Sequence, residues 1–146
     1  MKKLLTRALA ALCLLALCGC SSEGLRERRL PLKLDDAETV SVTDAATGET
    51  VRLTESESVR VVTEAITTQK YVQTSKLETG NESLWTDQYV VYRVEWLNAD
   101  GNVTDALDIT HESGYQIRYH DTMRKVADGK NIDMSVFAGL FEEESP

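Results

Sequence analysis

The two histidines, His111 and His120, are the side chains in this chain best suited to acid–base chemistry or metal binding, and each has acidic neighbours. A hairpin tip is predicted at Glu112–Gly114, which would place His120 opposite Ala106 on the preceding strand. At about 3.3 Å of rise per residue, the two imidazole rings would then lie more than roughly 10 Å apart. We therefore expect no metal shared by both histidines, and a role for either one alone stays open.

An Asn- and Asp-rich stretch imitates the start of a calcium-binding loop. Asn98, Asp100 and Asn102 have the spacing of the first ligands of such a loop. Its sixth and twelfth positions, which require Gly and Glu, are occupied here by Val103 and Ile109. The stretch is therefore predicted to be a turn between two strands.

The sequence lacks the patterns of known catalytic sites. Asp105 and Asp108 differ in strand parity, so they do not form the facing carboxylate pair of a glycosidase. There is no Gly-x-Ser-x-Gly or Ser-x-x-Lys nucleophile motif and no glycine-rich phosphate loop. We therefore predict a protein that is not an enzyme, with no catalytic residues, no metal site and no cofactor.

The N-terminus has the organisation of an export signal. Lys2, Lys3 and Arg7 precede an uncharged run over residues 8–19. This run is shorter than the about 20 apolar residues needed to cross a bilayer, so a cleaved signal is predicted rather than a membrane span. One alternative is ordinary secretory cleavage near Gly19, which would release the domain.

The residues Leu17-Cys18-Gly19-Cys20 resemble the lipobox of bacterial prolipoproteins. The resemblance implies that residues 1–19 are a lipoprotein signal peptide and that Cys20 is lipidated and becomes the new N-terminus. The protein would then be anchored on the extracytoplasmic face of the cell membrane by more than one acyl chain, enough for stable attachment. Because the other two cysteines would be lost with the signal, the exported domain would contain no disulfide.

The mature chain is divided into a tether and one domain. Residues 20–37 are predicted to be the lipidated cysteine and a polar tether. Its only charge cluster is Arg26, Arg28 and Arg29, which either contacts lipid headgroups or is part of a solvated linker. Residues 38–146 are predicted to be a single domain, long enough to bury an adequate core without disulfides.

Apolar periodicity predicts the elements of this domain. A capping box at Thr54 and Glu57 predicts a helix that ends near Gln69 and carries Val59, Val62 and Ile66 on one face. Strands are predicted at 40–42, 51–53, 71–74, 88–97, 103–109 and 115–119, with a short edge strand at 123–126 and a final helix capped by Asp133. This order predicts an α+β fold: a single twisted antiparallel sheet made from an N-terminal hairpin, a helix, a three- to four-strand meander and a C-terminal helix.

The body of the chain is also similar to small uncharacterised lipoprotein domains of Firmicutes. The features that carry this resemblance are Thr47-Gly48 in the hairpin turn, the helix spaced by Val and Ile, Asp100-Gly101 after a strand, and Ile132-Asp133 before the last helix. The resemblance covers about residues 38–141 and implies no chemistry, because these are turn and cap positions.

Three residues, Trp85, Tyr89 and Arg93, are candidates for binding a partner, and two nearby aromatic residues are not. Tyr92 and Trp96 share strand parity with buried valines and are predicted to be in the core. Trp85 and Tyr89 are predicted to form an exposed aromatic patch with Arg93, since aromatic and arginine side chains suit protein interfaces.

The formal net charge of −8 provides no electrostatic footprint for nucleic acid. The sequence therefore favours a membrane-anchored lipoprotein domain that binds a protein, a peptide or a cell-wall component, with an envelope protein as the expected partner. Two alternatives stay open: an inhibitor or accessory subunit of an envelope enzyme, and a small ligand- or metal-binding lipoprotein.

Overall fold

The computed structural model describes residues 26–76, 87–112 and 114–142. Within these ranges the chain forms seven strands and two α-helices. The strands are β1 (Thr39–Asp44), β2 (Thr50–Leu53), β3 (Tyr71–Lys76), β4 (Val90–Leu97), β5 (Val103–His111), β6 (Tyr115–Tyr119) and β7 (Thr122–Val126). The helices are α2 (Ser56–Thr67) and α3 (Ser135–Ala138), and two short 3₁₀-helices are η3 (Asp87–Tyr89) and η4 (Ala127–Gly129).

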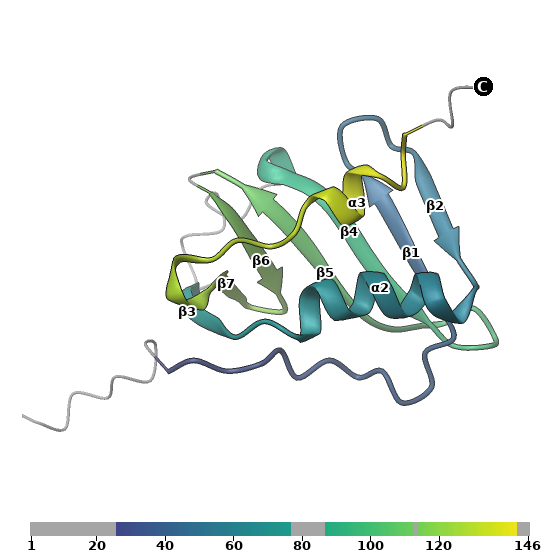
Figure 1. Ribbon diagram of the computed structural model, residues 1–146, viewed down its shortest axis with the longest axis horizontal. Helices are drawn as coiled ribbons and strands as arrows, with labels where there is room; N and C mark the ends of the chain where they lie inside the picture. The colour runs from purple at the N-terminus through teal and green to yellow at the C-terminus, as the bar shows by residue number, and fades with distance from the viewer. Residues whose placement is uncertain (1–25, 77–86, 113, 143–146) are drawn as a thin grey trace, which may run out of the picture.

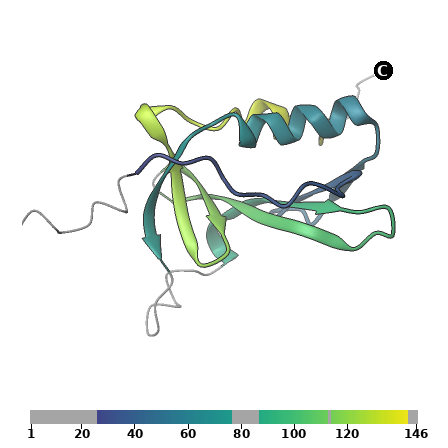
Figure 2. The same ribbon diagram turned by 90° about the horizontal axis from the view of Figure 1, so that it is seen from below.

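The seven strands form one antiparallel sheet with the order β2-β1-β4-β5-β6-β7-β3. Both helices lie on the same face of this sheet (Figures 1 and 2). The predicted α+β class with a single antiparallel sheet is therefore confirmed. We call the face opposite α2 and α3 the open face, because no α-helix of the described residues lies on it.

Helix α2 is held to the sheet by its apolar stripe. Val62 and Ile66 are buried, as the periodicity predicts, and Trp96 of β4 donates a hydrogen bond to Thr63 Oγ1 at 3.1 Å. The predicted capping box is wrong, because the N-cap residue is Glu55 and makes no side-chain capping bond. The amphipathic face, rather than a cap, accounts for the position of this helix.

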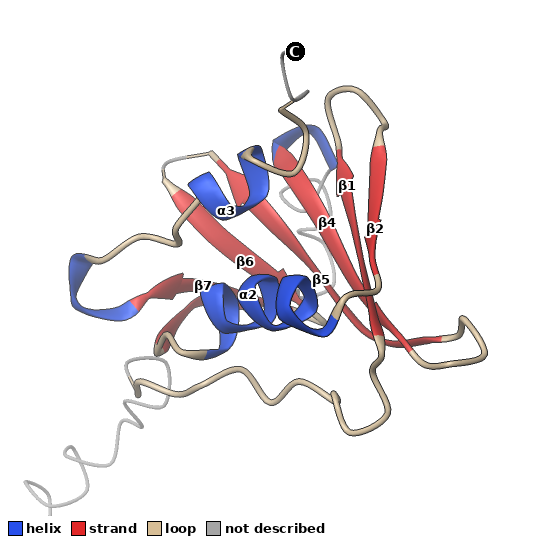
Figure 3. Cartoon of the chain, turned by 45° about the vertical axis from the view of Figure 1, so that its right-hand side comes forward, coloured by secondary structure: helices blue, strands red, loops and turns tan. Residues whose placement is uncertain are grey.

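The last helix is shorter than predicted but contributes a core residue. The predicted cap at Asp133 is wrong, because the N-cap residue is Met134 and makes no side-chain capping bond. Asp133 Oδ1 instead accepts a hydrogen bond from the Ser135 N–H at 3.1 Å, just before α3, which extends for only four residues. Its Phe137 is fully buried and stacks on Tyr92 with ring centroids 5.7 Å apart. Figure 3 shows α3 beside α2 on the covered face of the sheet.

Part of the segment predicted to be a tether packs on the domain. Arg28 exchanges two backbone hydrogen bonds with Tyr71, at 2.9 and 2.8 Å, and Leu30 belongs to the buried core. Residues 26–38 run along the side of α2 (Figure 1). The chain is thus fixed to the β3 end of the sheet ten residues or more before the predicted start of the domain at residue 38.

Two predicted strands differ from the structure. The strand predicted from residue 88 begins at Val90, because Asp87–Tyr89 forms the 3₁₀-helix η3. The strand predicted at the sheet edge, β7, is an inner strand, since β3 pairs with its free side from Tyr71↔Val126 to Lys76↔Thr122.

Among the residues that the structure describes, no helix has the length and apolar character needed to span a membrane.

Candidate functional site

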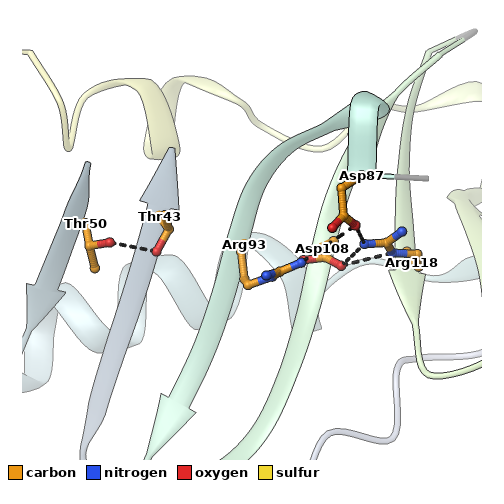
Figure 4. Close-up of polar contacts among 6 residues, drawn as sticks. All are labelled: Thr43, Thr50, Asp87, Arg93, Asp108 and Arg118. Carbon is orange, nitrogen blue, oxygen red and sulfur yellow. Dashed lines mark hydrogen bonds and ion pairs between the residues drawn. The ribbon is translucent and has the colours of Figure 1, made fainter. Parts of the chain in front are cut away.

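A line of polar residues crosses the open face. The strand registers align Thr50 with Thr43, Thr43 with Arg93, Arg93 with Asp108, and Asp108 with Arg118. Residues that face each other across antiparallel strands point to the same side of the sheet. Five neighbouring strands therefore present one continuous polar line, which Figure 4 shows.

Asp108 is the centre of this line. Its Oδ1 accepts a hydrogen bond from Arg93 Nε at 2.8 Å, and its Oδ2 accepts two from Arg118, from Nε at 2.9 Å and Nη2 at 2.6 Å. Only 13% of the Asp108 side chain and 14% of the Arg118 side chain are exposed. Charge-assisted bonds of this geometry hold both guanidinium planes in fixed orientations.

Asp87 adds a second carboxylate from outside the sheet. It lies in η3, and its Oδ1 accepts a hydrogen bond from Arg118 Nη2 at 2.6 Å and lies 3.9 Å from Arg93 Nη2 (Figure 4). We call Asp87, Arg93, Asp108 and Arg118 the arginine–carboxylate cluster. It carries two positive and two negative charges and is therefore neutral as a unit.

The contacts within the cluster shift the pKa values of Asp87, Arg93 and Arg118 toward their charged forms. The hydrogen bond from Arg118, followed by its positive charge, holds the pKa of Asp87 below the usual range. The hydrogen bond to Asp108 raises the pKa of Arg93. Burial by itself would lower the pKa of Arg118, but the hydrogen bonds to Asp87 and Asp108 outweigh it and the net shift is upward.

A shallow hollow of about 290 Å³ adjoins the cluster on the open face. Arg93, Asp108 and Arg118 line it together with Glu95 and His120. Further along the same face, the hydroxyl groups of Thr43 and Thr50 are hydrogen-bonded at 2.8 Å. The arrangement offers many donors and acceptors on a broad surface, which is typical of macromolecular recognition rather than of an enclosed small-molecule site.

A groove of about 760 Å³ lies on the covered side, between α2 and residues 34–39. Among the described residues, its charged lining consists of Glu38, Arg60 and Glu64, and it includes no histidine, cysteine or lysine. This groove therefore holds no pairing of a nucleophile with a histidine base.

The predicted partner-binding residues fall in three different situations. Arg93 is on the open face, and 46% of its side chain is exposed. Tyr89 is half-buried at the end of η3, so strand alternation does not set the direction of its side chain. Trp85, like the predicted lipidation site Cys20, lies outside the described residues.

The two histidines are separated as the sequence predicts. The β5–β6 register pairs His111 with Tyr115 and Asp108 with Arg118. Extending this register by two residues beyond Arg118 places His120 opposite Ala106. His120 lies beyond β6 with a φ of 51° and contacts the ring of Tyr119. No group of three His, Cys, Asp or Glu side chains in the described part of the chain is arranged to hold a metal ion.

Asp105 is a buried carboxylate on the covered face. Its Oδ2 accepts hydrogen bonds from the Lys33 N–H at 2.8 Å and the Tyr119 hydroxyl at 2.9 Å, and its Oδ1 accepts one from the Ala106 N–H. Burial, then the hydrogen bond and charge of Asp105, raise the pKa of Tyr119 to about 12. Both oxygens are thus used by the chain itself, which gives Asp105 a structural role in joining the N-terminal segment to the sheet.

Three members of the cluster were not singled out from the sequence. The predicted β5–β6 hairpin already places Asp108 opposite Arg118, so the signal for that pair was present in the register. Asp87 had no such signal, because its position depends on how the chain enters β4.

Comparison of the chain with protein-family models, with curated proteins and with solved structures found no match.

Proposed function

We propose that this protein is an envelope lipoprotein, anchored through Cys20 on the extracytoplasmic face of the membrane, whose domain binds a protein or peptide without catalysing a reaction. The observation that carries the proposal is the arginine–carboxylate cluster on the open face. The lipobox-like residues 17–20 support the location.

The cluster suits recognition because its arginines are already oriented. Asp108 binds Nε of Arg93, which leaves terminal N–H groups of a half-exposed side chain accessible to a partner. A fixed guanidinium loses less side-chain entropy on binding than a mobile one, and arginine is enriched among residues that dominate interface energies. Carboxylates or main-chain carbonyls of a partner are the matching acceptors. Trp85 and Tyr89 are proposed as further contacts.

Replacing Arg93 with alanine is expected to reduce capture of the partner about tenfold or more, as for an interface hot spot. The measurement is chemical crosslinking of the native protein in whole cells, followed by mass spectrometry of the captured proteins. Tyr89→Ala and Trp85→Ala test the aromatic contacts in the same assay.

Arg60→Ala is the matched control for this experiment. Arg60 also pairs with two carboxylates, Glu57 and Glu64, and is 53% exposed, but it lies on α2 on the opposite side of the sheet. Capture that survives in both variants, or that is lost equally in both, would contradict recognition by the open face. Capture of no protein from cells with an intact anchor would direct the search to small ligands and wall polymers.

Replacing Cys20 with serine is expected to abolish incorporation of labelled palmitate and to move the protein out of the membrane fraction, because the acyl chains have no other thiol acceptor at the cleavage site. Cys18→Ser is the control, since the middle lipobox position tolerates exchange. Continued labelling of the Cys20→Ser protein would refute the proposed anchor without affecting the proposed binding face.

A further inference from the structure

A small basic cavity lies at the β3 end of the molecule, away from the open-face cluster. It has a volume of about 140 Å³ and is lined by Arg26, Arg28, Gln73 and Arg124. These residues come from three separate segments: the N-terminal segment, β3 and β7. We call this group the basic cavity.

Backbone pairing accounts for the convergence of the three arginines. Arg28 forms a two-bond bridge with Tyr71, and continuing this antiparallel pairing by two residues brings Arg26 opposite Gln73. Gln73 is in turn the register partner of Arg124 in β7. Arg124 is oriented further by the hydrogen bond from its Nε to Thr122 Oγ1 at 3.0 Å. The cavity is thus built on the β3–β7 pair and on the N-terminal segment, which the isolated bridge at Arg28 fixes to β3.

The concentration of positive charge here opposes the charge of the protein as a whole, which is −8. In the described ranges, no carboxylate forms an ion pair with any of the three arginines; the nearby Glu27 pairs with Lys70 instead, at 3.6 Å. Three guanidinium groups around one small space repel each other unless an anion lies between them. An oxyanion with several acceptor oxygens is the natural counter-charge, and arginine binds phosphate with paired N–H donors.

We propose that the basic cavity binds a phosphate group. The phosphate belongs either to a lipid headgroup or to a soluble phosphorylated compound, since both offer the same tetrahedral oxyanion. The headgroup source rests on the proposed anchor: Arg26 is six residues from Cys20, a distance of at most about 20 Å for an extended chain. Binding of phosphate itself does not depend on the anchor.

The first test is titration of inorganic phosphate into the purified full chain, followed by the NMR signals of the arginine Nε–Hε groups. We expect saturable shifts that chloride at equal ionic strength does not reproduce. Arg28→Gln and Arg124→Gln should each weaken binding about tenfold or more. Arg29→Gln removes the same charge from the same segment but does not line the cavity, so binding should be unchanged. Circular dichroism checks that each variant is folded. If Arg124→Gln does not fold, the phosphate affinity of Arg28→Gln alone tests the proposal.

The second test distinguishes the two sources of phosphate. In the Cys20→Ser background, which removes the anchor from every sample, co-sedimentation with phosphatidylglycerol vesicles is compared for Arg28→Gln and Arg29→Gln. A larger loss of vesicle co-sedimentation for Arg28→Gln than for Arg29→Gln, together with competition between inorganic phosphate and the vesicles, shows that the cavity binds a lipid headgroup. Equal sedimentation with intact phosphate binding assigns it to a soluble phosphate.

Shifts that do not saturate, that chloride reproduces, or that Arg29→Gln weakens as much as Arg28→Gln would overturn the proposal, because they would indicate diffuse attraction rather than a site. This failure is independent of the crosslinking result for Arg93, because Arg93 belongs to the open-face cluster and does not line the basic cavity.

Discussion

Replacing Asp105 with alanine is expected to lower the free energy of unfolding by about 2 to 4 kcal/mol. The Asp105 side chain is only 4% exposed, and its Oδ2 is the acceptor for both the Lys33 N–H and the Tyr119 hydroxyl. Alanine leaves the Lys33 N–H without the Asp105 carboxylate as its acceptor. The hydrogen bond that joins the segment 26–38 to β5 at Lys33 is thereby lost. Tyr119 retains a second acceptor, the Pro31 carbonyl at 3.2 Å, which limits the loss. Denaturant unfolding of the full chain measures the change.

Asp121→Asn is the control for this prediction. Asp121 is 55% exposed and, in the part of the chain that the structure describes, forms an ion pair with Lys76 alone, so its replacement should change the free energy of unfolding by less than about 0.5 kcal/mol. A double-mutant cycle of Asp105→Ala with Tyr119→Phe should show coupling, because each change removes one partner of their hydrogen bond. Equal, small losses for Asp105→Ala and Asp121→Asn would show that the buried carboxylate is not structural.

The same contact predicts a dependence of stability on alkaline pH. The pKa of Tyr119 is about 12 in the folded protein and about 10 in an unfolded chain. The raised pKa stabilises the folded state below pH about 10, and this contribution is lost as the pH rises from about 10 to about 12. Asp105→Asn removes the negative charge and should lower the pKa of Tyr119, while burial keeps it above its ordinary value. Ultraviolet absorbance titration, with Tyr119→Phe to identify the signal, tests this.

Replacing Phe137 with alanine is expected to lower the free energy of unfolding by about 3 to 5 kcal/mol. Phe137 is completely buried and stacks on Tyr92, although it is held by a helix of only four residues. The short helix cannot close the cavity that alanine would leave, because its position depends on this same side chain. Unfolding by denaturant, followed by tryptophan fluorescence, provides the measurement.

Phe141→Ala is the matched control. Phe141 also stacks on Tyr92, with centroids 5.8 Å apart, but it is only partly buried. Its replacement should cost less than about half as much as that of Phe137, since less apolar surface is removed from contact. Equal losses would show that the difference in burial between the two rings has no energetic consequence.

Several features of the fold could be predicted because they depend on neighbours in the sequence. Alternating apolar residues and glycine turns were sufficient for the β1–β2 and β5–β6 hairpins, and the predicted β5–β6 register is the one observed. The helix stripe at Val62 and Ile66 was predictable for the same reason, as local periodicity reports which side must be buried. The residues Leu30, Leu32 and Leu34 alternate in the same way: Leu30 is buried in the core, and Leu32 and Leu34 are partly buried and pack against it, although the segment is polar overall.

Other features depend on contacts that no local pattern specifies. The pairing of β1 with β4 and of β3 with β7 joins segments distant in sequence, and many alternative pairings would satisfy the same alternation. The cluster itself depends on a bulge between Trp96 and Leu97. Without it, continued Leu97↔Val103 pairing would place Arg93 opposite the buried Leu107 instead of Asp108.

The sequence by itself therefore determined the class of fold, the inward residues and the separation of the two histidines, because each follows from local alternation and turn chemistry. It also determined the lipobox-like motif on which the proposed location rests. Only the tertiary structure brought Arg93 to Asp108 and Asp87, and Arg26 and Arg28 to Arg124. The physical reason is that strand order and bulges depend on how the whole core is buried. The sequence of a short segment does not specify them.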